Sequence, residues 1–232
     1  MSVLTIVAIA IPATLVLCVI IAYLIWYNST EQKNLRTIRA TPGVRIADAA
    51  EGQLVRVVGE LKLRGKGLVS PVTETACAYY ETRILESRRG ESSAASSNWI
   101  TVWRDTDSRD FYVQDDSGLA LVHTLHAKAI VSDRIEYSIG TLNDDNPELR
   151  LFAQAHGLLS QGLLGGDQPL RSEEGLLEPG KKVAVVGIAR WVDGARNESS
   201  DGHSSDPQRL LHIEAPHGDS VLLSDNLLAW TS

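Results

Sequence analysis

The longest uninterrupted apolar stretch of the chain lies near its beginning. The residues from Val3 to Tyr27 include no charged side chain and one proline, Pro12. A helix of this length rises about 37 Å, more than the roughly 30 Å hydrocarbon core of a bilayer. The sequence therefore predicts a transmembrane anchor at residues 1–28, with the lipid bilayer as a partner through Val3 to Tyr27.

A cleaved signal peptide is the alternative reading of this stretch. It requires a basic segment before the apolar run and a shorter run that ends at small side chains. Here neither Met1 nor Ser2 is basic, and the run ends in Tyr23, Trp26 and Tyr27. Aromatic rings of this kind are typical of a membrane interface, which favours the anchor.

Basic residues follow the apolar stretch, and none precedes it. Because Lys and Arg close to a span resist translocation, we expect a single-pass protein with its N-terminus outside. A juxtamembrane stalk at residues 29–45 then leads to a domain in the cytoplasm. The basic residues of the stalk are Lys33, Arg36, Arg39 and Arg45.

Composition limits the partners of the remaining chain. The formal net charge is -7, which argues against nucleic acid, since phosphate binding depends on clustered Lys and Arg. The two cysteines are Cys18, within the predicted span, and Cys77, so an intramolecular disulfide between them is implausible.

The sequence pattern of residues 46–232 predicts a mainly-β (α+β) domain. Short segments rich in aromatic and β-branched residues alternate with turn formers, as in antiparallel sheets. One amphipathic helix begins at Pro147 within a linker of about 147–165 that separates β-rich halves of about 46–140 and 175–230. The expected strands are 52–61, 76–85, 99–104, 110–114, 118–123, 129–139, 179–189, 210–214 and 220–223.

A short repeat links the two halves. The pattern is G-x-x-V-x-V-V-G, where x is any residue. It occurs at Gly52 to Gly59 and again at Gly180 to Gly187. A matched strand at the start of each β cluster suggests two related small β units packed together.

Motifs spread over residues 40–228 resemble the GIDE domain. This domain occurs in RING-type E3 ubiquitin ligases of mitochondrial and chloroplast outer membranes and in many bacterial membrane proteins. The resemblance implies a membrane-associated interaction domain. The matching residues are Leu68, Ser70, Pro71, Cys77, Tyr79, Tyr80, Trp99, Val102, Phe111, Asp115, Gly118 to Val122, Glu173 to Leu177, Pro179, Gly180, Val183 to Gly187 and Leu222 to Ser224.

The chain differs from those ligases in one decisive respect. A RING binds two zinc ions through about eight closely spaced Cys and His ligands. Only nine residues follow Leu223, and none of them is Cys or His. The sequence thus predicts a RING-less member of the family, in which no residue supports ubiquitin transfer.

Three candidate reactive groups have structural alternatives. Asp116-Ser117-Gly118 matches the tripeptide of aspartic proteases, in which two carboxylates share one proton. The tripeptide occurs once, so such an enzyme would need two chains, each contributing Asp116. The same residues also suit a tight turn between strands. His123 and His126 are three apart and face opposite sides of a strand, which disfavours a shared metal ion. Cys77 lies beside Tyr79 and Tyr80 and is interpreted as a half-buried strand cysteine.

Two functional hypotheses follow. The preferred one is a membrane-anchored, non-catalytic module that binds a protein partner or senses a signal, with no catalytic, cofactor or metal site. The alternative is a membrane enzyme, either a component of an E3 ubiquitin transferase or a dimeric aspartyl hydrolase.

Overall fold

The computed structural model describes residue 18 and residues 29–89, 97–140, 146–159, 168–193 and 209–230. Within them, five strands close into a barrel. The order around it is β1-β6-β7-β12-β11, and β11 pairs again with β1. The barrel strands are β1 (Leu54–Leu63), β6 (Phe111–Gln114), β7 (Leu119–Val122), β11 (Lys182–Val192) and β12 (Leu210–Glu214).

All neighbours in the barrel are antiparallel except β7 and β12, which run parallel. Numbered along the chain, the five strands follow the order 1-2-3-5-4, as in a five-stranded OB-type barrel. Alternate residues of these strands, such as Val57, Phe111 and Ile213, point inward and are fully buried. Two short strands, β13 (Leu222–Ser224) and β8 (Lys128–Ile130), extend the sheet beyond β11.

The repeated sequence forms one antiparallel pair in this barrel. β1 and β11 carry the two copies, and Val57 pairs with the equivalent Val185. The hydrogen bond from Gly52 N–H to Ala189 C=O is matched by one from Gly180 N–H to Leu61 C=O, each 2.8 Å long. The prediction of two related β units is therefore wrong, since both copies lie side by side in one barrel.

The last glycine of each copy lies where its strand exchanges partners. β1 pairs with β11 up to Glu60 and with β6 from there on, and β11 changes from β1 to β12 at Ile188. A Cβ atom on Gly59 would lie 2.4 Å from the carbonyl oxygen of Gln114, and one on Gly187 would lie 2.6 Å from that of Glu214. These glycines allow the close backbone approach at the barrel corners.

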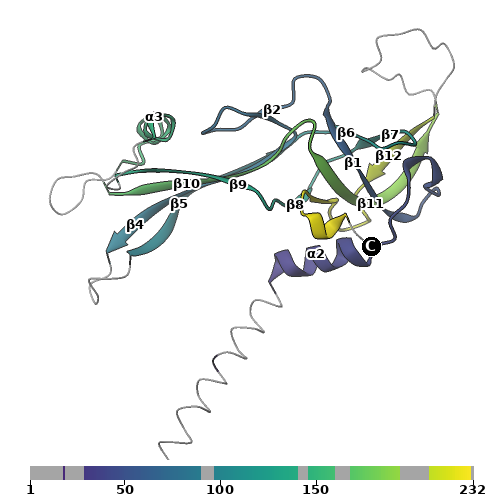
Figure 1. Cartoon of the computed structure of the whole chain (residues 1–232), viewed down its shortest axis with the longest axis horizontal. Helices are drawn as coiled ribbons and strands as arrows, with labels where there is room; N and C mark the ends of the chain where they lie inside the picture. The colour runs from purple at the N-terminus through teal and green to yellow at the C-terminus, as the bar shows by residue number, and fades with distance from the viewer. Residues whose placement is uncertain are drawn as a thin grey trace, which may run out of the picture.

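Two insertions into the barrel combine into a second sheet, which we call the arm (Figure 1). One insertion, between β1 and β6, carries the ribbon of β2 (Leu68–Val69) and β3 (Ala76–Cys77) followed by a long hairpin. The other lies between β8 and β11. The arm order is β5-β4-β10-β9, with β4 (Tyr79–Arg89), β5 (Ser97–Ser108), β9 (Arg134–Ile139) and β10 (Leu170–Leu177).

Two α-helices cover parts of these sheets. α2 (Thr30–Ala40) is capped by Ser29, whose side chain accepts a hydrogen bond from Gln32 N–H. It buries Leu35 and Ile38 against the outer face of β8, β11 and β13. α3 (Pro147–Ala155) packs on one face of the arm. Single 3-10 turns lie at η1 (Ile46–Asp48) and η2 (Leu227–Ala229).

The sequence prediction of a single-pass membrane protein is contradicted. Among the described residues, no helix has the length and apolar character needed to cross a bilayer. A span needs about 20 apolar residues, whereas α2 has 11 residues and several charges, and α3 has 9. This corrects the fold class and the localisation. The segment Val3 to Tyr27, apart from Cys18, lies outside the described residues.

Candidate functional site

The two faces of the arm differ in what covers them. α3 packs against Ile84, Ile139 and Leu170 on one face. The alternation of side chains along each strand places a set of charged and aromatic residues on the other face. We call this surface the open face. It comprises Glu81, Arg83, Trp99, Arg104, Arg134, Glu136, Arg171 and Glu173.

Glu81 lies at the centre of the open face with 8 % of its side chain exposed. Its carboxylate accepts hydrogen bonds from Arg83 Nε at 3.1 Å, Arg104 Nη2 at 2.7 Å and Arg134 Nη2 at 3.0 Å. Burial alone would raise the pKa of Glu81, but the bonds from Arg83 and Arg134 outweigh it and hold that pKa below its ordinary value. One carboxylate thus holds three guanidinium groups in place.

A fourth arginine lies beside an aromatic ring on the same face. Arg171 Nη2 donates to Glu173 at 2.9 Å, and its guanidinium carbon lies 5.0 Å from the centre of a Trp99 ring. Glu173 is only 15 % exposed, whereas Arg171 and Arg104 are 32 % and 63 % exposed. Arginine therefore covers these two carboxylates, so the surface that solvent meets is mainly cationic, with Glu136 at its edge.

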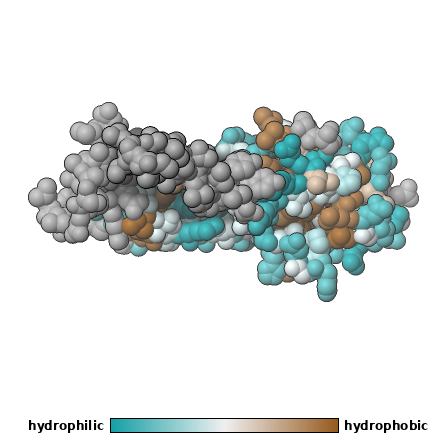
Figure 2. Space-filling model, turned by 90° about the horizontal axis from the view of Figure 1, so that it is seen from below, coloured by the Kyte–Doolittle hydropathy of each residue, from teal (hydrophilic) through white to brown (hydrophobic). Residues whose placement is uncertain are grey.

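Exposed apolar side chains are spread over several elements. Figure 2 views the molecule from below and shows hydrophobic spots interspersed with hydrophilic surface over the part of this side that the structure describes. The large exposed hydrophobic residues of the described chain lie on β1, β2, β5, α3, η2 and the loop after β7. They are Leu54, Val69, Ile100, Leu125, Leu151, Leu227 and Leu228.

The Asp116-Ser117-Gly118 segment forms the turn between β6 and β7. Asp116 is exposed, while the preceding Asp115 organises the turn by accepting hydrogen bonds from the N–H groups of Ile46, Ser117 and Gly118. Burial would raise the pKa of Asp115, but these bonds together with the Ser117 hydroxyl lower it below its ordinary value. The geometry matches the turn interpretation.

Cys77 is fully buried in β3 and packs with Leu68, Tyr80 and Leu176. Burial, with a smaller contribution from the charge of Glu174, raises the pKa of its thiol from 9.0 to about 12. The thiolate is the reactive form of cysteine. At neutral pH this thiol is therefore protonated, as expected for a packing residue.

Thiol labelling should separate the two cysteines. In the native protein we expect a maleimide at pH 7 to modify one thiol per chain, the exposed Cys18. Cys77 should react only after urea unfolding, because it is buried and its pKa is about three pH units above its ordinary value. Mass spectrometry of the labelled peptides checks this, and rapid native labelling of Cys77 would contradict it.

The structure separates His123 from His126 and pairs His123 with a different histidine. His123 Nε2 lies 2.9 Å from His212 Nδ1, and the Nδ1 atom of His123 lies 2.8 Å from Asp110 Oδ2. Burial and the nearby His123 lower the pKa of His212, which favours its neutral form. Glu214 completes a group of possible metal ligands with His123 and His212. Spacing along the sequence could not reveal this pair, because 89 residues separate the two histidines.

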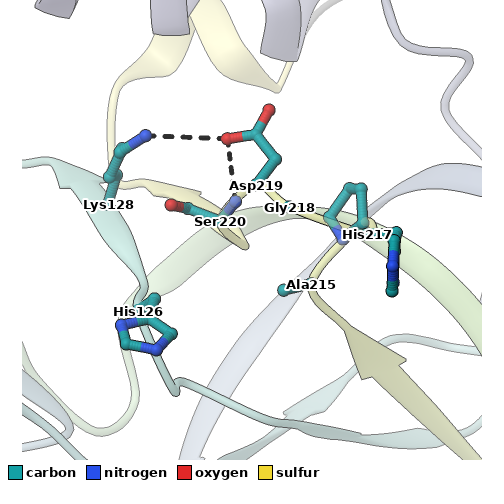
Figure 3. Close-up of a pocket in the computed structure, with 8 residues that line it drawn as sticks. His126, Lys128, Ala215, His217, Gly218, Asp219 and Ser220 are labelled. Atoms are coloured by element: carbon teal, nitrogen blue, oxygen red, sulfur yellow. Dashed lines mark hydrogen bonds and ion pairs between the residues drawn. The ribbon is translucent and has the colours of Figure 1, made fainter.

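His126 instead lines an open surface pocket of about 540 Å³ (Figure 3). Lys128 Nζ and Asp219 Oδ1 form an ion pair of 3.6 Å at its edge, and His217 lies on the side away from His126. No potential ligand group that includes His126 or His217 occurs among the described residues.

In comparisons with known proteins, no family model, no curated protein and no solved structure matches the chain. The resemblance to the GIDE domain therefore stays a prediction from the sequence motifs.

Proposed function

We propose that the protein is a non-catalytic interaction module whose open face binds an acidic segment of a partner protein. The observation that carries this proposal is the cluster of four arginines and Trp99 on the arm face opposite α3, where Glu81 and Glu173 hold the arginines. Arg and Trp are enriched among the residues that dominate binding energy at protein interfaces.

The geometry of the cluster supports an anionic peptide as the ligand. Guanidinium groups bind carboxylates through paired, directional hydrogen bonds, and arginine clusters recur in the recognition of acidic motifs. Burial lowers the pKa of Arg83, but the hydrogen bond and the charge of Glu81 raise it above its ordinary value, with smaller contributions from the charges of Glu173 and of Glu31 at the start of α2. A carboxylate from outside the arm can therefore interact favourably with this face.

The arm is also suited to present these groups without a large rearrangement. The three bonds to Glu81 fix Arg83, Arg104 and Arg134, so binding does not have to order all of these long side chains. Ordering a flexible side chain costs about 0.5–1.5 kcal/mol at an interface. The open face is therefore partly preorganised for its ligand.

A peptide-binding measurement tests the proposal. We expect a fluorescent glutamate-rich 12-residue peptide to bind the full chain, and a lysine-rich peptide of equal length not to bind. Replacing both exposed arginines by glutamine, Arg104→Gln with Arg171→Gln, should raise the Kd for the acidic peptide about 30-fold, because charged hydrogen bonds are lost while side-chain length is kept. Fluorescence anisotropy at physiological salt measures each Kd.

The control removes the same charge elsewhere on the surface. Arg39 and Arg45 are exposed and lie outside the arm. The double variant Arg39→Gln with Arg45→Gln should keep a Kd within about twofold of the wild-type value, because remote surface charges are screened by salt. If the two double variants weakened peptide binding equally, the effect would depend only on net charge, and the proposal would be overturned. Failure of the wild-type chain to bind the acidic peptide, or stronger binding of a single-stranded oligonucleotide, would also overturn it.

A further inference from the structure

A second cluster of polar side chains lies on the barrel, apart from the open face. β7 and β12 run parallel, and their pairing places His212 beside Leu121 and Ile213 beside Val122. Leu211 and Ile213 point into the barrel core. Because side chains alternate along a strand, His212 and Glu214 point outward. His123, which follows Val122, lies beside them on the same outer surface.

The distances within this cluster suit a single metal ion. One ligand atom from each of His123, His212 and Glu214 lies within 4.8 Å of the others. His123 Nε2 and His212 Nδ1 are 2.9 Å apart. Two nitrogen ligands at about 2.0–2.1 Å from a tetrahedral zinc ion lie roughly 3.3 Å apart. The two nitrogens would therefore need to separate by only a few tenths of an ångström, and the rings would turn so that both lone pairs point at the ion.

Asp110 orients His123 for this role. Its Oδ2 atom lies 2.8 Å from His123 Nδ1, and its Oδ1 atom accepts the N–H of Thr124 at 2.9 Å. A proton on Nδ1 satisfies Asp110 and leaves the lone pair of Nε2 directed at the neighbouring ring. Histidine ligands of metal ions typically donate their second ring nitrogen to a carboxylate in this way.

Glu214, the third candidate ligand, has an exposed partner. Glu214 pairs with Arg190 at 3.2 Å, and both side chains are substantially exposed. An exposed ion pair contributes about 0–1 kcal/mol, so Glu214 can turn toward the histidines at low cost.

We propose that His123, His212 and Glu214 bind one zinc ion, and that Asp110 positions His123. Two imidazoles and one carboxylate form a donor set that zinc accepts, and a fourth position stays open for water or a partner's side chain. Such a site lies outside the arm, so the zinc proposal and the peptide-binding proposal stand independently.

Metal titration of the tag-free full chain tests the site. Cobalt(II) serves as a spectroscopic probe because its visible absorption reports coordination by protein ligands, and zinc should displace it. We expect one equivalent of cobalt to bind, and a zinc Kd of about 1 μM or lower. Binding of several weak equivalents, or no saturable binding, would show adventitious metal only and overturn the proposal.

Variants assign the ligands. His123→Ala and His212→Ala should each weaken zinc binding at least 100-fold, and Asp110→Asn should weaken it about 10- to 100-fold, as for other groups that orient a ligand. His126→Ala is the matched control and should keep the wild-type Kd. Circular dichroism identifies variants that fail to fold, and His123→Gln then replaces His123→Ala. Equal loss in His126→Ala, or retained binding in folded His123 variants, would refute the site.

Discussion

Replacement of Gly59 by alanine is expected to lower the free energy of unfolding by about 3 kcal/mol. The new Cβ would lie 2.4 Å from the backbone carbonyl oxygen of Gln114 and 2.7 Å from a methyl carbon of Val113. A backbone oxygen in a closed barrel cannot move aside as the end of a flexible side chain can. The strands must therefore separate where β1 leaves β11 for β6. Urea unfolding measures the change.

The repeat supplies a second test of the same geometry. Gly187→Ala should be similarly destabilising, because its Cβ would lie 2.6 Å from the carbonyl oxygen of Glu214. Gly118→Ala is the control, since its Cβ would meet a side-chain methyl of Ile46 at 3.2 Å. We expect it to cost about 1 kcal/mol or less. A loss below 0.5 kcal/mol in Gly59→Ala, with an unchanged dependence on urea, would argue against this close approach.

Local patterns in the sequence predicted many elements but not their partners. The strands β1, β6, β7, β11 and β12 lie close to their expected ranges. The interval 129–139 was expected to form one strand, yet it divides into β8 and β9, which belong to different sheets. Hydrophobic alternation identifies a strand, whereas the sheet it joins depends on residues far away in the chain.

The repeat illustrates the same limit. Two copies of a strand sequence are equally compatible with two separate units and with two neighbours related by a local two-fold axis. The pairing of Val57 with Val185 shows that the two copies are neighbouring strands of one barrel. β10 was not expected at all, because its sequence, LRSEEGLL, places a glutamate where a buried strand normally has an apolar residue.

The candidate sites were beyond the reach of sequence motifs for a related reason. The four arginines of the open face come from four strands, and each ordinarily reads as a solvated surface residue. Only the register places Arg83 opposite both Arg104 and Glu173. In the same way, His123 was compared with the nearby His126, while its structural neighbour His212 belongs to the last strand of the barrel.

Glu174 should be among the most sensitive positions of the arm. Its side chain is fully buried on the face opposite the open face. Oε1 accepts the N–H of Val72 at 3.0 Å and the hydroxyl of Thr82 at 2.7 Å, and Oε2 accepts the N–H and the hydroxyl of Thr73 at 3.0 and 2.6 Å. This carboxylate thus ties the turn between β2 and β3 to the centre of the sheet.

We expect Glu174→Ala to destabilise the protein by about 4 kcal/mol, because each buried donor left without an acceptor costs about 1–3 kcal/mol. Glu174→Gln should lose about half as much, since its amide oxygen can replace only one carboxylate oxygen. Glu173→Ala is the matched control and removes the hydrogen bond from Arg171, whose guanidinium is partly solvated, for about 1–2 kcal/mol. Urea unfolding measures all three. Hydrogen exchange should show lost protection at Val72 and Thr73 in Glu174→Ala alone, whereas equal losses in both alanine variants would mean that Glu174 does not hold this turn.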